Sequence, residues 1–179
     1  MTKQSAGSKL TPPAGERDHI QGPPTASVTL VEYGDYQCSY CGAAYPVVKE
    51  LQARLGDRLR FVFRNFPIAT MHPYAEHAAE AAEAAGAQGK FWEMHDALFE
   101  NQDTLTDHDL VQHAVTLGLD AARVASELTE HTHAARVHED FMSGARSGVN
   151  GTPTFFINGL RHDAEIDLET MLAAVEERR

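Results

Sequence analysis

The sequence predicts an α/β fold, a sheet flanked by helices, that is interrupted by an inserted all-helical domain. The β-branched, apolar run ASVTLVEY (26–33) leads through a helical pattern to a second strand pattern, RLRFVFRNFP (58–67). Residues 72 to about 147 carry helical periodicity alone, and strand residues return in GTPTFFING (151–159). At 179 residues, the chain is long enough for one domain with a large insertion.

Composition divides the chain into three parts. Residues 1–26 are rich in Pro, Gly, Ser and charge, which predicts a flexible N-terminal tail or strap. Residues 27–70 and 148–179 carry the strand patterns and form the predicted sheet domain. Residues 71–147 form the predicted helical insertion between these two segments.

The charge argues against two classes of partner. The 15 Lys and Arg stand against 26 Asp and Glu, a formal charge of −11, which disfavours nucleic acid and anionic membrane surfaces. The sequence has neither a run of roughly 20 apolar residues nor a signal-peptide core. We therefore expect no membrane span and a monomer in the cytoplasm. The compartment would be the periplasm or the cell exterior if a leader had been removed.

The first predicted strand ends near Gly34, and an amphipathic helix follows from Cys41, with a kink expected at Pro46. The second strand alternates apolar and polar residues until Pro67 stops it. Two strands around one helix predict a βαβ unit with parallel strands and a right-handed crossover.

The insertion predicts four or five helices. Asp107 and Asp120 are the expected N-terminal caps, and Gly118 is an expected break. A group of large apolar residues at helical spacing could form a substrate groove, but residues in such a pattern more often belong to the hydrophobic core. This group comprises Phe91, Trp92, Met94, Leu98 and Phe99.

The C-terminal part predicts a hairpin followed by a helix. The strand TFFI is bounded by Asn158 and Gly159, a turn-forming pair that leads to a short strand at 160–162. Residues 167–177 close the chain as an amphipathic helix.

The segment QCSYC (37–41) holds both cysteines of the chain. Cys38 lies where a strand leads into a helix, and the unpaired N–H groups and helix dipole at that point favour a thiolate. Cys41 lies one turn further on the same face, within the Cα separation of about 5.5 Å that a disulfide requires. This spacing predicts a nucleophile, Cys38, whose mixed disulfide is resolved by Cys41.

A zinc site is the alternative for these cysteines. It would need two histidines in addition, and His72 and His77, or His133 and His138, lie five residues apart and share a helical face poorly. We expect no metal ion and no cofactor. The later histidines of the insertion are interpreted as solvated positions, namely His108, His113, His131, His133 and His138.

Glu32 and Pro153 are further candidate residues of the cysteine site. Glu32 lies in the apolar strand, where an acid is unfavourable unless it has a use, and it could relay protons to Cys41. The alternatives are a solvent-facing Glu32 or one paired with a basic residue.

Pro153 begins a strand, where a cis bond to Thr152 would expose the Thr152 backbone to an extended substrate. An ordinary trans edge proline is the alternative.

The runs VTLVEYGDYQCSYCGAAYP and VNGTPTFFINGL, with helices between them, resemble bacterial DsbA-like thiol–disulfide oxidoreductases. The resemblance implies a thioredoxin-like fold with an inserted all-helical domain. It also implies that Cys38 attacks, that Cys41 is the buried resolving cysteine, and that Glu32 is the acid near the buried sulfur. Thr152 with cis Pro153 would face the disulfide and guide substrate.

The chain departs from this family at one position, because Ser39 stands where the family commonly has Pro. Ser39 and Tyr40 are therefore expected to tune the reduction potential. The expected activity is disulfide exchange with protein or peptide substrates, coupled to glutathione, thioredoxin or a membrane oxidase. The alternatives are a non-catalytic chaperone, adaptor or metal-binding module, and a glutathione-dependent reductase or isomerase of small molecules.

Overall fold

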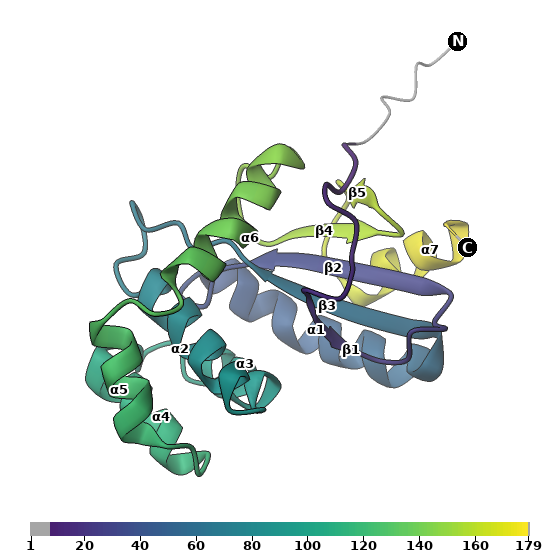
Figure 1. Cartoon of the computed structure of the whole chain (residues 1–179). Helices are drawn as coiled ribbons and strands as arrows, with labels where there is room; N and C mark the ends of the chain where they lie inside the picture. The colour runs from purple at the N-terminus through teal and green to yellow at the C-terminus, as the bar shows by residue number, and fades with distance from the viewer. Residues whose placement is uncertain (1–7, 179) are drawn as a thin grey trace.

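A computed structural model describes residues 8–178, which form one five-stranded sheet with helices on both faces (Figure 1). The strand order across the sheet is β1-β3-β2-β4-β5. The strands are β1 (His19–Gln21), β2 (Val28–Gly34), β3 (Leu59–Asn65), β4 (Thr154–Ile157) and β5 (Leu160–His162).

The central pair, β2 and β3, is parallel over its whole length, from Val28 opposite Leu59 to Gly34 opposite Asn65. The helix α1 (Ser39–Leu55) connects the two strands, so the predicted βαβ unit is confirmed. The helix begins two residues before the expected start and contains Pro46. On its other edge β2 pairs with β4 in antiparallel register. The carboxyl end of β2, which leads to the cysteines, therefore lies beside the start of β4.

Five helices are inserted between β3 and β4, in agreement with the predicted insertion. They are α2 (Ala75–Ala87), α3 (Phe91–Glu100), α4 (Asp107–Thr116), α5 (Ala121–Thr129) and α6 (Ala134–Arg146). A last helix, α7 (Leu168–Glu177), follows β5. No helix in the described residues combines the length and the apolar character needed to cross a bilayer.

The two faces of the sheet have separate apolar cores. Leu30 and Phe61 pack with α1, α2, α3 and α7 on one face. Val31, Tyr33 and Val62 pack on the other face against the N-terminal segment and Phe141 of α6. Side chains alternate along a strand, so Glu32 shares its face with Leu30, toward α1. Four of the five large apolar residues proposed as core at 91–99 are buried, and Trp92 packs against them.

The N-terminal segment from Ser8 to Ala26 runs as a strap along the sheet, and residues 1–7 lie outside the described residues. Its strand β1 pairs with the edge of β3 in antiparallel register. Lys9 forms a bridge with Leu160 at the opposite edge. The strap therefore crosses one face of the sheet from edge to edge, as Figure 1 shows in dark purple.

The helix caps differ in part from the expectation. Asp120 caps α5 as predicted, because its carboxylate accepts a hydrogen bond from the Arg123 N–H. Asp107 was expected to cap α4, and this prediction is wrong. Thr106, one residue earlier, is the cap and forms a capping box with Asp109.

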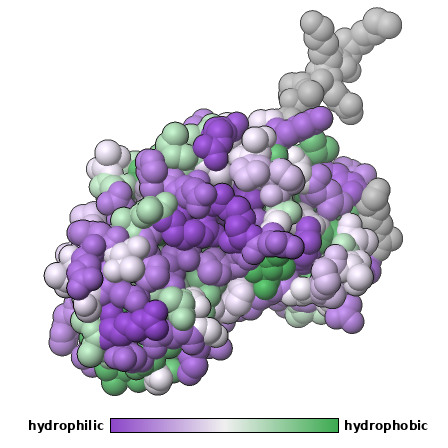
Figure 2. All heavy atoms as spheres, viewed as in Figure 1, coloured by the Kyte–Doolittle hydropathy of each residue, from purple (hydrophilic) through white to green (hydrophobic). Residues whose placement is uncertain are grey.

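Figure 2 shows that one face of the molecule is mostly hydrophilic, with hydrophobic residues in small separate patches. The large apolar side chains are accordingly found in the two cores. The exposed exceptions include Tyr40 next to the cysteines and Met71 in the loop after β3.

Candidate active site

Cys38 is the N-cap residue of α1, with extended backbone angles of φ −71° and ψ 122°. Its side chain is almost entirely buried, with 5% exposed. The pKa of Cys38 is lowered to about 5, first because the Cys41 thiol donates a hydrogen bond to its sulfur. The Thr152 hydroxyl and the backbone N–H groups of Tyr40 and Cys41 also favour the thiolate, while burial opposes it.

Cys41 is fully buried one turn into α1. Burial raises the pKa of its thiol well above the ordinary range, and the hydrogen bond to Cys38 and the charge of Glu32 act in the same direction. Both cysteines are free thiols in this structure. At neutral pH the pair therefore consists of a thiolate at Cys38 and a thiol that donates to it at Cys41.

Glu32 is 2% exposed, which excludes the solvent-facing alternative. Its pKa is raised to about 8, mainly by burial and secondly by the negative charge of Cys38. The buried Oε1 atom has no hydrogen-bond partner among the residues that the structure describes. Glu32 is thus a carboxyl group on the α1 face of the sheet that changes protonation near neutral pH.

The Thr152–Pro153 peptide bond is cis. The Thr152 carbonyl oxygen lies 3.5 Å from the Cys38 sulfur, where it accepts a hydrogen bond from the protonated thiol. The Thr152 hydroxyl is buried and has no hydrogen-bond partner within the described residues. The loop that precedes β4 therefore faces Cys38 directly.

Ser39 and Tyr40 follow Cys38 in the first turn of α1, and both are exposed. Tyr40 is 76% exposed. This is the highest exposed fraction among the exposed large apolar side chains of residues 8–178. The first turn of α1 after Cys38 is therefore open to solvent at these two side chains.

Asp35 organises the turn before the cysteines, and sequence reasoning missed it. One carboxylate oxygen accepts hydrogen bonds from the backbone N–H groups of Gln37 and Cys38, at 2.8 and 3.2 Å. The other accepts from the Ile68 N–H at 2.9 Å and lies 2.7 Å from His72 Nδ1. An Asp at the start of a turn is a local signal for such bonds to following N–H groups.

Gln102 was also missed, and no local pattern identifies it. Its side-chain amide donates to the carbonyl oxygens of Tyr36 and Cys38, at 2.9 and 2.8 Å. It lies so close to Gly42 that a Cβ atom at that position would collide with it. The loop after α3 in the insertion therefore holds the cysteine turn from outside the sheet.

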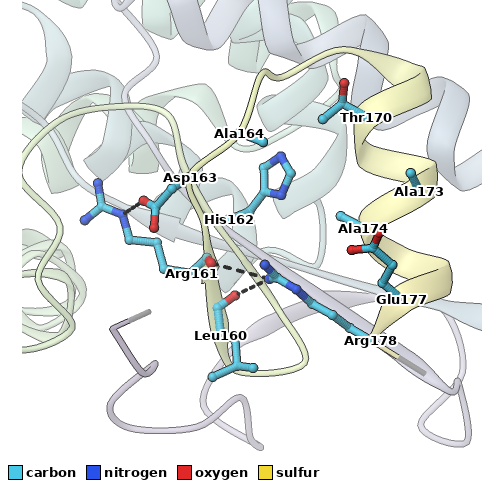
Figure 3. A pocket seen from close by; sticks show the side chains of 10 residues that line it. All are labelled: Leu160, Arg161, His162, Asp163, Ala164, Thr170, Ala173, Ala174, Glu177 and Arg178. Atoms are coloured by element: carbon cyan, nitrogen blue, oxygen red, sulfur yellow. Dashed lines mark hydrogen bonds and ion pairs between the residues drawn. The ribbon is translucent and has the colours of Figure 1, made fainter. Parts of the chain in front are cut away.

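Neither cysteine lines the two cavities described next. The first, of about 430 Å³, lies between β5 and α7 (Figure 3). There Arg178 donates to the carbonyl oxygens of Leu160 and Arg161, which ties α7 to β5. The second, a groove of about 630 Å³, is bounded by residues 66–70 and α6 and reaches Asn150.

A C-x-x-C pair at a strand–helix junction, opposite the loop that precedes β4 and within this sheet order, defines a thioredoxin-fold protein with a paired-cysteine site. The sequence profile of the family described as Thioredoxin matches residues 15–177. The chain therefore belongs to the thioredoxin family.

Solved structures share this fold. Oxidised BdbD from Bacillus subtilis superposes with a TM-score of 0.84 and 24% identity, covering 97% of this chain and 96% of that one. A thioredoxin-like oxidoreductase from Silicibacter pomeroyi DSS-3 gives 0.80 and 27%, covering 91% and 92%. Wolbachia pipientis alpha-DsbA1 gives 0.78 and 17%, covering 92% of each chain. The expected DsbA-like fold is confirmed.

Curated relatives match in sequence over nearly the whole chain. The Na(+)/H(+) antiporter NhaA 1 of Salinispora arenicola is 48% identical over 166 residues, which cover 93% of this chain and 25% of that protein. The NhaA of Herminiimonas arsenicoxydans is 42% identical over 171 residues, covering 95% and 27%. The chain thus spans about a quarter of the length of these relatives.

Proposed function

We propose that this protein is a thiol–disulfide oxidoreductase that exchanges disulfides with protein or peptide substrates through Cys38 and Cys41. The observation that carries the proposal is the opposite shift of the two pKa values, with Cys38 lowered to about 5 and Cys41 raised. A low pKa makes a good nucleophile at neutral pH and a good leaving group. The similarity to a solved protein that is named a thioredoxin-like oxidoreductase supports the same activity.

The cycle consists of two exchanges. The Cys38 thiolate attacks one sulfur of a substrate disulfide, forms a mixed disulfide with it, and releases the other substrate sulfur as a thiolate. Cys41 then loses its proton and attacks the Cys38 sulfur. The Cys38–Cys41 disulfide forms, the second substrate sulfur leaves, and the substrate is reduced by two electrons. In the reverse direction the protein oxidises a substrate dithiol.

Glu32 is the proposed acceptor of the Cys41 proton. The Cys38 thiolate raises the pKa of Glu32, and this charge disappears when Cys38 is in the mixed disulfide. The pKa of Glu32 should then fall, so the carboxylate becomes available as a base at the step that needs it. Because the pKa of Glu32 falls when the mixed disulfide forms, Glu32 should accept the Cys41 proton at the resolving step and not before it.

Substrate would bind along the loop opposite Cys38. The nearness of the Thr152 carbonyl to the Cys38 sulfur supports a backbone contact with an extended peptide. Exposed Ser39 and Tyr40 would border the substrate, and their backbone N–H groups would help set the reduction potential.

The nucleophile is tested by serine variants in an insulin reduction assay. We expect Cys38→Ser to abolish turnover, and Cys41→Ser to accumulate a covalent mixed disulfide detectable by mass spectrometry. Retained turnover in Cys38→Ser would falsify the assignment. The Ser126→Ala variant, at an exposed position on α5, is a control that should keep turnover and form no trapped complex.

The role of Glu32 is tested by following decay of the mixed disulfide after rapid mixing. Loss of a general base typically slows such a step on the order of 10²-fold, so Glu32→Gln should slow resolution while leaving the first attack unchanged. Glu50→Gln, at an exposed position on α1, is the control. An unchanged decay rate in Glu32→Gln removes Glu32 from the mechanism.

The direction of electron flow follows from the reduction potential of the Cys38–Cys41 pair. Titration of the Cys38–Cys41 disulfide in glutathione buffers measures this potential. A value near ~ −270 mV, as in thioredoxin, would favour a reductase, and a value near ~ −120 mV, as in DsbA, would favour an oxidant. Glutathione, thioredoxin and a membrane oxidase are the proposed partners. A pair that forms no reversible disulfide at any potential would favour a binding module instead.

A further inference from the structure

Three metal-type ligands meet in the helical insertion, away from the cysteines. They are His77, Glu80 and His131, and one nitrogen or oxygen of each lies within 4.8 Å of the others. His77 and Glu80 are three residues apart on α2 and share a face of that helix. His131 comes from the connection between α5 and α6, which packs beside them.

Glu80 is the buried member of this group, with 4% exposed. Its Oε1 atom lies 3.2 Å from His131 Nδ1. Its Oε2 atom is buried and has no hydrogen-bond partner in the described portion of the chain. An unpartnered carboxylate oxygen inside a protein is unfavourable, and a bound cation would satisfy it.

His77 is oriented by a carboxylate. Its Nδ1 atom lies 2.6 Å from Asp107 Oδ1, at the start of α4. A carboxylate oxygen only accepts, so Nδ1 is the donor in this hydrogen bond, and Nε2 is the nitrogen that remains for a metal ion. A carboxylate partner of this kind is common among histidines that bind metals.

His131 has a left-handed backbone, with φ 53°. Its side chain is 56% exposed and has room to rotate. A four-coordinate zinc ion with ligands near 2.1 Å keeps them roughly 3.4 Å apart. The ligand atoms now lie within 4.8 Å of one another and would move closer to that value around a bound ion.

We propose that His77, Glu80 and His131 bind one divalent transition-metal ion of the zinc type, with water as a fourth ligand. Two imidazoles and one carboxylate are typical of such ions and unlike the all-oxygen sites of calcium and magnesium. The bound ion joins α2 to the α5–α6 connection and lies at the rim of the 630 Å³ groove, which Glu80 and His131 also line. The proposal replaces the expectation that His131 is merely solvated, and it does not depend on the cysteine chemistry.

The test uses the variant Cys38→Ser, Cys41→Ser, because thiolates bind zinc themselves. After removal of metal, titration with Zn²⁺ should give one ion per chain. Titration with Co²⁺ should give visible d–d bands and no sulfur-to-cobalt charge-transfer band. The added substitution His77→Ala or His131→Ala should abolish both signals.

Two further variants sharpen the result. Asp107→Asn keeps the three ligands but loses the carboxylate that orients His77, and should weaken binding roughly 10–100-fold. His138→Ala removes an exposed imidazole that lines the same groove but does not belong to the cluster, and should bind like its parent. Circular dichroism establishes that each variant is folded.

Thermal unfolding provides a second measurement. Zn²⁺ should raise the Tm of the parent and of His138→Ala, and leave the Tm of His131→Ala unchanged, because an ion that binds only the folded state stabilises it. The proposal would be overturned if the parent did not bind zinc. It would also be overturned if His77→Ala and His131→Ala bound zinc as well as the parent does. The cluster would then be an ordinary ion pair between Glu80 and His131.

Discussion

Cys38 and Cys41 are three residues apart, yet their pKa values move in opposite directions. Cys38 lies at the first N–H groups of α1 and accepts a hydrogen bond from Cys41. Cys41 lies inside the core and acts as the donor. Each shift strengthens the other, because a thiolate at Cys38 holds the proton on Cys41.

The thiolate should be visible by its absorbance at 240 nm. We expect the reduced protein to titrate with a midpoint of about 5, and Cys38→Ser to lose this step. Cys41→Ala removes the strongest donor to the Cys38 sulfur, so its midpoint should be higher than that of the parent. A parent midpoint near the ordinary cysteine value of ~8.5 would contradict this account.

Glu32 should make stability depend on pH. Its folded pKa of about 8 lies above the ordinary value of 4.5, so the folded protein holds an extra proton between these pH values. The favourable contribution is complete below the ordinary pKa and is lost as the pH rises through about 8.

Glu32→Gln should therefore gain stability relative to the parent as pH rises, by up to about 1.4 kcal/mol per pH unit in this range. Urea unfolding of the reduced proteins from pH 5 to pH 8 measures the difference. A difference that stays constant with pH would show that Glu32 does not titrate in the fold. Glu50→Gln, exposed on α1, should show no such trend.

At the scale of elements, the junction of β2 and α1 depends on the Asp35 carboxylate. The carboxylate accepts hydrogen bonds from three backbone N–H groups, two in the cysteine turn and one at Ile68 in the loop after β3. The same group thus fixes the direction in which α1 leaves the sheet and the position of the loop beside it.

Asp35→Ala removes the acceptor of the Gln37 and Ile68 N–H groups, and leaves the Cys38 N–H with only the carbonyl oxygen of residue 35, at 3.1 Å. We expect a loss of about 2–3 kcal/mol in the free energy of unfolding, since buried unpaired donors are unfavourable. Urea unfolding at neutral pH measures it, with the exposed Asp57→Ala as the control. A loss equal to that of the control would mean that the turn does not need the carboxylate.

At the scale of the whole molecule, the N-terminal strap is held to the sheet by Arg64. The guanidinium donates to both carboxylate oxygens of Asp18, at 2.8 and 3.0 Å, and to the carbonyl oxygens of Pro12 and Pro13. It also donates to the Tyr33 hydroxyl. Both partners of the ion pair have nearly inaccessible side chains, 1% and 0% exposed.

Asp18→Ala leaves the buried Arg64 charge without its partner. Breaking such a pair typically destabilises by about 3–5 kcal/mol, because the remaining charge is uncompensated. Unfolding in urea tests this, and Glu16→Ala, an exposed acid in the same segment, should change little. If the two variants were equally stable, the strap would add nothing to the stability of the domain.

The sequence by itself determined four of the five strands, the parallel βαβ unit, the helical insertion and the cysteine pair at a helix start. Each depends on residues close together in the chain: apolar alternation in β2 and β3, helical spacing in α1, and the Asn158–Gly159 turn, whose φ angles of 48° and 80° are both positive. The domain boundaries stay predictions from composition.

Only the tertiary structure decided which distant groups meet. The three-residue β1 has no pattern of its own and exists because β3 offers a free edge. Gln102 reaches Cys38 across 64 positions, and His131 reaches Glu80 across 51. Burial likewise decides that Glu32 titrates near pH 8. A sequence pattern encodes local periodicity, whereas these contacts depend on how elements far apart in the chain pack together.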